Sequence, residues 1–217
     1  MASLSPYFDE DKTTIEAGID EAGRGPMFGR VYTAAVILPK DTDESIYNHS
    51  LMKDSKRFHS KRKIQEAYDY IKEHAVAYCV SFKDEKEIDT VNIRQATLLS
   101  MHESVKNLPV QPNMLLVDGN DFKPYVQFNG EEFTQIPHVC IKGGDNKYTP
   151  IAAASIMAKV ERDEYIDKIC DENPELDELY GIRSNKGYGT KLHMDAIKEN
   201  GISKWHRKSY GICKTFT

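Results

Sequence analysis

Short apolar stretches rich in β-branched residues recur along the chain and predict the strands of a sheet. The first two are separated only by the Gly- and Pro-rich segment Gly23–Gly29, which predicts a tight turn between them. The predicted strands span 15–20, 30–38, 75–82, 114–117 and 137–141.

Longer stretches carry apolar residues at helical spacing and predict four helices. Ser60 is placed to cap the first helix, and Asn200-Gly201 is placed to stop the last. Small residues in the longest stretch allow that helix to pack closely on a sheet. The predicted helices span 61–74, 89–105, 151–170 and 190–198.

Tightly joined early strands followed by alternating helices and strands predict an α/β fold, with a mixed sheet flanked by helices. No internal repeat, low-complexity tract or flexible linker interrupts the sequence. We therefore expect residues 1–217 to form one domain, with about 1–14 as a short N-terminal extension. In such a sheet ligands bind at the strand ends.

The composition is that of an ordinary soluble globular protein, with 40% hydrophobic and 29% charged residues among 217. No apolar run approaches the roughly 18 residues that span a bilayer, and the first residues do not form a secretory signal. The four cysteines include no C-x-x-C pair, which argues against a zinc site or a disulfide framework. We therefore expect an intracellular, cytoplasmic protein without membrane contact.

The net charge of −5 conceals an uneven distribution. The segment 51–63 carries six basic residues against Asp54, and 183–217 carries eight against Asp195 and Glu199. The segment 161–178 is strongly acidic. Such runs are solvated faces in most proteins, but two basic segments can also form a groove for phosphates. Composition leaves both interpretations open.

Acidic residues stand at or just after three predicted strands. An aspartate such as Asp118, taken alone, is most often a turn residue. The adjacent Asp20 and Glu21 are harder to explain, because neighbouring carboxylates between an apolar strand and a glycine turn repel each other. A divalent cation relieves this repulsion. Oxygen ligands without a Cys/His cluster point to Mg²⁺ or Mn²⁺, and two such ions support phosphoryl displacement.

Eight sequence blocks, in order from residue 17 to 211, resemble those of type 2 ribonucleases H, the ribonuclease HII family. The blocks are Gly18–Pro26, Asp54-Ser55-Lys56, Ile88-Asp89 with Asn92-Ile93, Val117-Asp118-Gly119, Lys142–Asp145, Ala152–Val160, Lys186–Thr190 and His206–Ser209.

The resemblance implies the ribonuclease H-like mixed sheet, with a helical C-terminal part, and a metal-dependent nuclease. By the same resemblance the catalytic metal ligands are Asp20, Glu21, Asp118 and Asp145, with Asp20 bridging two Mg²⁺ or Mn²⁺ ions. Asp163 is a rival fourth carboxylate. We favour Asp145 because it follows a strand, whereas Asp163 lies well along a predicted helix, where an ion-paired surface role is expected.

The resemblance also assigns substrate contacts. The turn Gly23-Arg24-Gly25 is implied to contact the ribose 2′-OH, and its glycines let the backbone approach a ligand closely. Tyr188 is implied to pack on the sugar at the RNA–DNA junction. The candidate phosphate contacts are Lys56, Lys142 and Lys159, each of which taken alone reads as a generic surface lysine.

Three features depart from the family pattern. An extra glycine stands in Lys142-Gly143-Gly144-Asp145. Asn185 replaces a frequent histidine, and Phe28 and Arg30 are bulkier or more charged than usual, which suggests an altered rim of the ribose site. His206-Arg207-Lys208 is expected to extend a basic rim.

The implied reaction is hydrolysis of the phosphodiester 5′ of a ribonucleotide, leaving 3′-OH and 5′-phosphate ends. The partners would be RNA/DNA hybrid or duplex DNA with embedded ribonucleotides, and the role removal of RNA primers and misincorporated ribonucleotides. A type 3 ribonuclease H, a non-catalytic hybrid-binding module and a dinucleotide-binding enzyme are the alternatives. We expect a monomer, and residues 213–217 show no clear sliding-clamp peptide.

Overall fold

The computed structural model describes residues 4–128 and 130–216, so the ends of the predicted N-terminal extension and C-terminal peptide lie outside the described residues. Its main sheet has five strands in the order β3-β2-β1-β4-β7. Strands β1, β4 and β7 are parallel, whereas β1, β2 and β3 are antiparallel to one another in turn. The strands are β1 (Glu16–Ala22), β2 (Val31–Ile37), β3 (Ala77–Lys83), β4 (Met114–Asp118) and β7 (His138–Ile141).

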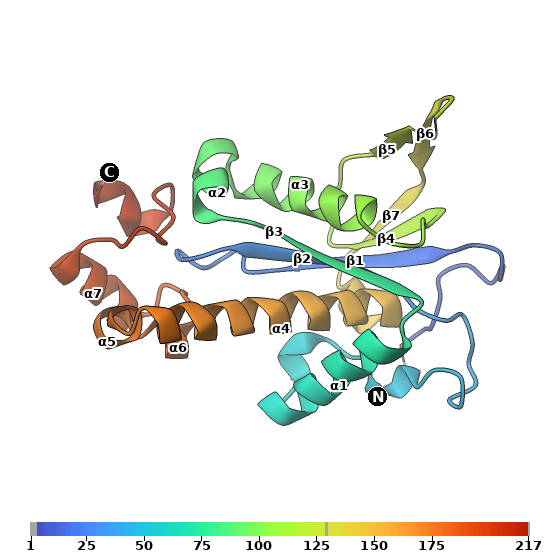
Figure 1. Cartoon of the computed structure of the whole chain (residues 1–217), viewed down its shortest axis with the longest axis horizontal. Helices are drawn as coiled ribbons and strands as arrows, with labels where there is room; N and C mark the ends of the chain where they lie inside the picture. Colours follow the sequence, from blue (N-terminus) through green and yellow to red (C-terminus); the bar gives the residue numbers. More distant parts are fainter. Residues whose placement is uncertain (1–3, 129, 217) are drawn as a thin grey trace.

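Helices cover both faces of this sheet (Figure 1). The longest, α4 (Thr149–Glu172), packs on β1 and β2, and α1 (Lys61–His74) lies against its outer side. On the opposite face α3 (Ile93–Lys106) packs on β2 and β3, preceded by α2 (Glu85–Val91). Two large apolar clusters lie between these helices and the sheet, one on each side of it. The predicted mixed α/β fold is confirmed.

The local signals at the helix ends act as predicted in two places. Ser60 caps α1 by accepting a hydrogen bond from the Lys63 amide, and α7 (Lys191–Asn200) ends at Asn200, followed by Gly201. Thr190, predicted as the first residue of that helix, instead caps it by accepting from the His193 amide. The single helix predicted over 89–105 is wrong, because it is divided at Asn92. This residue has φ of 69° and caps α3 through its side chain.

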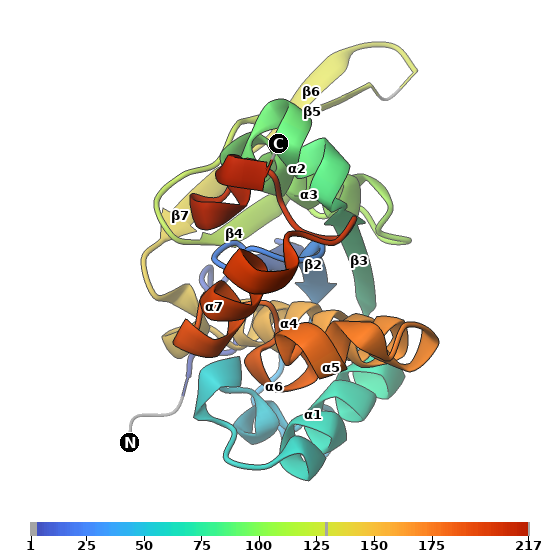
Figure 2. The ribbon, with the colours of Figure 1, turned by 90° about the vertical axis from the view of Figure 1, so that its left-hand side faces the viewer.

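Sequence patterning did not predict the hairpin of β5 (Tyr125–Phe128) and β6 (Phe133–Ile136), which projects from the body of the molecule (Figure 2). The C-terminal part is helical, as expected, and packs around the distal half of α4. It contains α5 (Glu175–Tyr180), α6 (Ile182–Asn185), α7 and the 3₁₀ helix η4 (Gly211–Phe216). Short 3₁₀ helices also span η1 (His49–Leu51), η2 (Ser55–Arg57) and η3 (Gly144–Asn146). Within the described ranges, no helix combines the length and apolarity needed to cross a bilayer.

Candidate active site

The strand register brings the acidic residues to one end of the sheet. Ile19 of β1 pairs with Val117 of β4, so the next residues, Asp20 and Asp118, lie side by side at the carboxyl ends of parallel strands. Asp118 in turn pairs with Ile141, the last residue of β7, four residues before Asp145. The predicted convergence of strand ends therefore follows from the register of the parallel strands.

Asp20 carries the most strongly perturbed carboxyl of this group. Its side chain is buried, and its Oδ1 accepts a hydrogen bond of 2.7 Å from the Glu21 amide. Burial raises the pKa of Asp20 well above its ordinary value, and the charges of Glu21 and Asp118 raise it further. The hydroxyl of Ser155 opposes this shift by hydrogen bonding. A buried carboxylate among like charges is stabilised by a cation.

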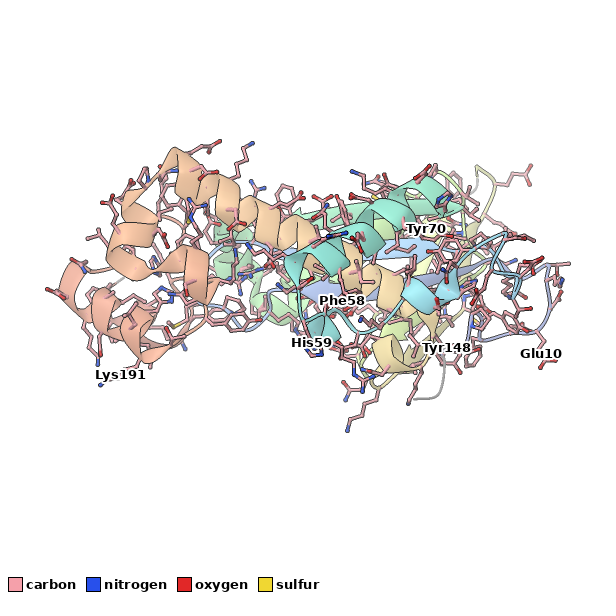
Figure 3. The ribbon with its side chains drawn as sticks, turned by 90° about the horizontal axis from the view of Figure 1, so that it is seen from below. Glu10, Phe58, His59, Tyr70, Tyr148 and Lys191 are labelled. Carbon is pink, nitrogen blue, oxygen red and sulfur yellow. The ribbon has the colours of Figure 1, made fainter. Side chains whose placement is uncertain are left out.

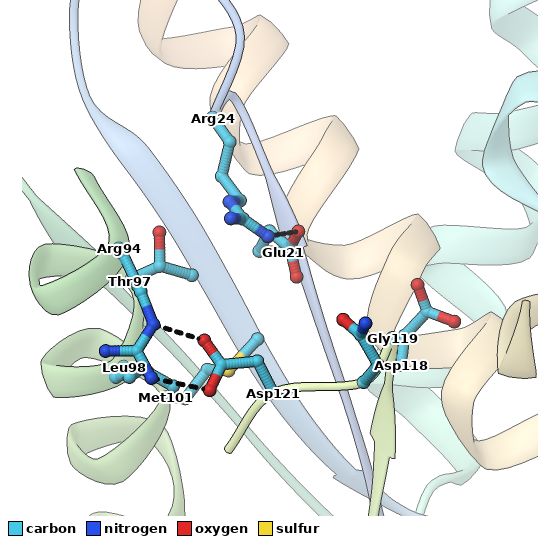
Figure 4. Close-up of a pocket in the computed structure, with 10 residues that line it drawn as sticks. Glu21, Arg24, Arg94, Thr97, Leu98, Met101, Asp118, Gly119 and Asp121 are labelled. Carbon is cyan, nitrogen blue, oxygen red and sulfur yellow. Dashed lines mark hydrogen bonds and ion pairs between the residues drawn. The ribbon is translucent and has the colours of Figure 1, made fainter. Parts of the chain in front are cut away.

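Glu21 and Asp118 line two hollows. One is the cleft beside Asp20, and the other is a smaller pocket, which Figure 4 shows. Burial raises the pKa of Glu21, although the guanidinium of Arg24, 3.3 Å from its Oε1, opposes the shift. Asp118 accepts a 2.7 Å hydrogen bond from the Gly144 amide. This bond ties the end of β4 to the turn that carries Asp145.

Asp145 is buried on η3, beside a second network of polar groups. Burial raises its pKa, and the nearby carboxylates Asp54 and Asp118 raise it further. The side-chain nitrogen Nδ2 of Asn146 donates to Asp145 Oδ1 at 3.0 Å and to Asp54 Oδ2 at 3.2 Å. Sequence reasoning had not singled out Asn146, and an exposed asparagine in a turn gives no signal for such a bridge.

The extra glycine before Asp145 has a structural explanation. Gly143 adopts a left-handed conformation with φ of 63°, which side chains disfavour. At Gly144 a Cβ would lie 2.5 Å from Cδ1 of Ile151, so a larger residue there would have to displace the end of that side chain. The two glycines therefore allow the Asp145 turn to pack closely against the helix.

Oxygen donors without histidine or cysteine fit a hard divalent cation such as Mg²⁺ or Mn²⁺, and the mutual repulsion of the carboxylates favours one. All four are partly engaged, Asp20 by the Glu21 amide, Glu21 by Arg24, Asp118 by the Gly144 amide and Asp145 by Asn146. In the described part of the chain, no three His, Cys, Asp or Glu side chains are arranged to hold a metal ion as they stand.

The cleft beside Asp20 has a volume of about 410 Å³. Lys56 stands at its edge and also lines a neighbouring pocket. Burial lowers the pKa of this ammonium, but several carboxylates outweigh that effect and the pKa is raised. The carboxylates are Asp54, Asp145, Asp20 and Asp118. The negative charges of these four carboxylates therefore all act on the Lys56 ammonium.

The rival carboxylate Asp163 lies in this cleft, whereas Asp145 is not among its lining residues. Asp163 forms an ion pair with Lys159 one helical turn before it on α4, and its side chain is 25% exposed. The expected ion pair is present, but it faces the cleft rather than an open surface. Lys159 is accordingly neutralised within the protein.

The glycine turn and Tyr188 lie next to each other in the lining of the cleft. Gly23 has φ of 93°, and a Cβ there would lie 2.2 Å from Arg162 Nε. A Cβ at Gly25 would lie 3.4 Å from the Tyr188 ring. The Tyr188 side chain is 51% exposed. Lys142, by contrast, is exposed outside the cleft.

The expected basic rim at His206-Arg207-Lys208 is wrong for two of its three residues. His206 and Arg207 are 1% and 0% exposed, respectively. The Arg207 guanidinium donates to the carbonyls of Gly23, Arg24 and Gly29 at 2.6, 3.1 and 2.8 Å. Buried main-chain carbonyls need donors, and a planar fork of five N–H groups supplies several at once.

A second buried arginine, Arg162, donates to the carbonyls of Arg30, Phe28 and Lys186. It thereby joins the turn after β1 to the loop that leads to Tyr188. The sequence did not predict that either arginine is buried, because nothing in the sequence separates a buried arginine from an exposed one.

The remaining departures act through packing. The Arg30 guanidinium lies 3.9 Å from the Phe82 ring centroid and 4.4 Å from that of Tyr165, and Phe28 is fully buried. Neither lines the cleft, but a Cβ at Gly187 would lie 2.8 Å from Phe28 Cβ, so Phe28 packs against the loop before Tyr188. Asn185 accepts a 2.7 Å hydrogen bond from the Gly187 amide and so shapes the loop before Tyr188.

Known proteins share both this fold and this sequence. The structure resembles that of ribonuclease H2 from Pyrococcus horikoshii OT3, with a TM-score of 0.74, 22% identity, and coverage of 93% of this chain and 96% of that one. It also resembles the RNase HII of Archaeoglobus fulgidus solved in complex with PCNA, with a TM-score of 0.68, 23% identity, and coverage of 91% and 96%. These likenesses confirm the ribonuclease H-like fold.

Sequence similarity is closer. Ribonuclease HII of Bacteroides thetaiotaomicron is 42% identical over 209 residues, covering 96% of this chain and 94% of that protein. Ribonuclease HII of Cytophaga hutchinsonii is 44% identical over 209 residues, with the same coverage. The model of the family described as Ribonuclease HII matches residues 17–213. The chain therefore belongs to the ribonuclease HII family, whose members are metal-dependent endoribonucleases.

Proposed function

We propose that this enzyme hydrolyses the phosphodiester 5′ of ribonucleotides in RNA/DNA hybrids and of single ribonucleotides embedded in duplex DNA. The products would carry 3′-OH and 5′-phosphate ends. The observation that carries this proposal is the cleft that joins buried Asp20 to the glycine turn and to the exposed ring of Tyr188. The lining of this cleft offers acidic oxygens for a cation, and backbone and an aromatic ring for a sugar.

Asp20, Glu21, Asp118 and Asp145 are the proposed ligands of Mg²⁺ or Mn²⁺, with two ions in the active complex. When bound, such ions activate water and stabilise the charge that develops on the phosphate. Asp20 is buried, the charges of both Glu21 and Asp118 act on it, and it is the candidate shared ligand. The raised pKa values of Asp20, Glu21 and Asp145 support this assignment, because burial, together with neighbouring carboxylates, disfavours their charged forms and a bound cation would relieve this.

The chain's own residues would bind and orient the duplex. Gly23-Arg24-Gly25 would present its backbone to the ribose 2′-OH, and Tyr188 would pack on the adjacent sugar. Lys56 and Lys159 line the cleft and would contact phosphates within it. Lys142 lies outside the cleft and would contact a phosphate farther along the duplex.

We further propose that residues 1–217 act as one catalytic domain, as a monomer inside the cell, in removing RNA primers and misincorporated ribonucleotides. The buried thiols of Cys170 and Cys213 suit a reducing compartment. The Archaeoglobus fulgidus relative was solved bound to PCNA.

The test is cleavage of three end-labelled duplexes of one sequence, containing a single ribonucleotide, an RNA/DNA hybrid stretch or only DNA. With Mg²⁺ or Mn²⁺ the enzyme should cut the first two, and the single-ribonucleotide duplex only at the 5′ side of that residue. A chelator should stop both reactions. Binding of the hybrid without cleavage would favour a non-catalytic module, and cutting of all-DNA duplex would contradict the proposed substrate.

A further inference from the structure

The segment of residues 4–9, which we call the N-terminal arm, is bound to the residues that follow Asp145. Ser5 forms an isolated parallel bridge with Tyr148. Its amide donates to the Lys147 carbonyl at 2.8 Å, and its carbonyl accepts from the Thr149 amide at 2.9 Å. The rings of Phe8 and Tyr148 lie 5.7 Å apart. Tyr148 is labelled at the start of α4 in Figure 3, on the side of the molecule to which the chain near Glu10 also runs.

The other end of the arm is fixed to the start of β1. The buried Glu16 carboxylate accepts hydrogen bonds from the amides of Phe8 and Asp9 at 3.0 and 2.6 Å. Lys40 forms an ion pair with Glu16 at 3.0 Å and donates to the Asp9 carbonyl at 2.9 Å. The arm is therefore tied at one end to the strand that carries Asp20 and at the other to the start of α4.

The start of α4 depends on this contact, because the first amides of a helix have no partner within it. Tyr148 occupies the capping position and provides no side-chain acceptor. The Ser5 carbonyl accepts from the Thr149 amide in its place. The amides of Lys147 and Tyr148 close back onto the Gly144 carbonyl at 2.9 and 2.8 Å, so Ser5 holds the residues that complete the Asp145 turn.

We infer that the N-terminal arm is a positioning element for Asp145, which sets how readily this carboxylate joins the metal site. The inference rests on the proposed role of Asp145 as a ligand. The side chain of Asn146 donates to both Asp145 and Asp54. The turn that carries Asp145 must therefore be fixed in place for this carboxylate to be available to a cation. Partners that orient a ligand typically affect metal affinity about 10–100-fold when they are lost.

Ser5→Pro and Ser5→Ala form a matched pair for testing this. Proline removes the amide that donates to Lys147, whereas alanine keeps both main-chain bonds and removes only the hydroxyl, which donates to the Tyr7 carbonyl. The measurement is direct Mn²⁺ binding by calorimetry, together with the Mn²⁺ concentration that half-saturates cleavage. We expect Ser5→Pro to raise the Mn²⁺ dissociation constant and the half-saturating Mn²⁺ concentration by about tenfold each, with a much smaller change in rate at saturating Mn²⁺. Ser5→Ala should match wild type.

A merely structural arm would lower the melting temperature and the rate at every Mn²⁺ concentration without changing the half-saturating value, and that result would overturn the inference. If Ser5→Pro fails to fold, Phe8→Ala decides, because its ring is 41% exposed and its loss weakens the contact with Tyr148. It should raise the half-saturating concentration in the same direction, and no rise would refute the inference.

Asp145→Asn, measured in the same titration, separates the two claims. If it leaves Mn²⁺ binding unchanged, the proposed ligand is wrong. If it weakens binding while neither arm variant does, the ligand stands and the role of the arm is overturned.

Discussion

The guanidinium of Arg207 donates a 2.6 Å hydrogen bond from Nη2 to the main-chain carbonyl of Gly23. Two more of its nitrogens reach the carbonyls of Arg24 and Gly29. One side chain from the C-terminal part thus fixes the backbone of the turn proposed to recognise the ribose. Arg207, which has no exposed surface, therefore holds the turn through the main-chain carbonyls of the turn.

Arg207→Lys should lower the free energy of unfolding by about 3 kcal/mol, because a single ammonium cannot serve three separate carbonyls and leaves buried acceptors unpaired. Urea unfolding measures this change. Arg62→Lys is the control, since its side chain is 88% exposed and forms an ion pair with the exposed Glu66, so it should change stability by less than about 0.5 kcal/mol. Equal stability of the two variants would show that the buried fork is dispensable.

Asp20→Asn should stabilise the metal-free protein, because it removes a buried charge that lies among like charges. In wild type, Mn²⁺ should raise the melting temperature by mass action, whereas the variant should show little of this shift and no cleavage. Thermal melts with and without Mn²⁺ test both effects, with Asp195→Asn on exposed α7 as the control. A variant that is less stable without metal and shifts like wild type with it would contradict the crowded-carboxylate account.

Tyr188 should act on substrate choice rather than on stability, because its side chain is half exposed. Tyr188→Ala removes the packing surface and should slow cleavage at a single embedded ribonucleotide more than cleavage of uniform hybrid, where every step offers a 2′-OH. Tyr188→Phe loses one hydroxyl, worth about 0.5–1.5 kcal/mol if it is hydrogen-bonded to the substrate. Initial rates on both substrates decide the matter. Equal slowing of the two by Tyr188→Ala would assign the ring a structural role.

The buried pair His193 and His206 predicts a loss of stability in acid. The Ser203 amide donates to His206 Nδ1, so His206 Nε2 carries a proton and donates to His193 Nε2 at 3.0 Å. The other nitrogen of His193 then donates to the Tyr188 carbonyl. Burial, with a further contribution from His193, lowers the pKa of His206 to about 3, so both rings are neutral in the folded protein.

Because the unfolded chain takes up this proton near pH 6.5 and the folded chain only near pH 3, the stabilisation is present above pH 6.5. It is lost as the pH falls through this window, by about 1 kcal/mol per pH unit for His206. The raised pKa values of Asp20, Glu21 and Asp145 act in the opposite direction without metal, but they are common to wild type and variant. Urea unfolding at pH 7 and pH 5 should show a shallower decline for His206→Gln, and an unchanged decline would disprove the assignment.

The strand-end carboxylates and the sheet were accessible from the sequence, because alternating apolar stretches mark strands and parallel strands end at one edge. The break at Asn92 was not, since an unusual φ leaves no mark in a continuous apolar pattern. The buried state of Arg207 depends on carbonyls about 180 residues away, so composition suggested a basic rim instead. The ion pair of Asp163 followed from its helix, but its position in the cleft required the packing of α4.

The assignment of Asp145 rather than Asp163 is the central claim about the site, since Asp163 lines the cleft and Asp145 stands on the turn bonded to Asp118. The most direct test is the single-turnover rate of cleavage at one embedded ribonucleotide, at saturating Mg²⁺, for Asp145→Asn and Asp163→Asn. Asp145→Asn should lower this rate by about 100-fold or more. Asp163→Asn should change it by less than about tenfold, because it loses only a partly exposed ion pair. The reverse order of the two rates would contradict the account.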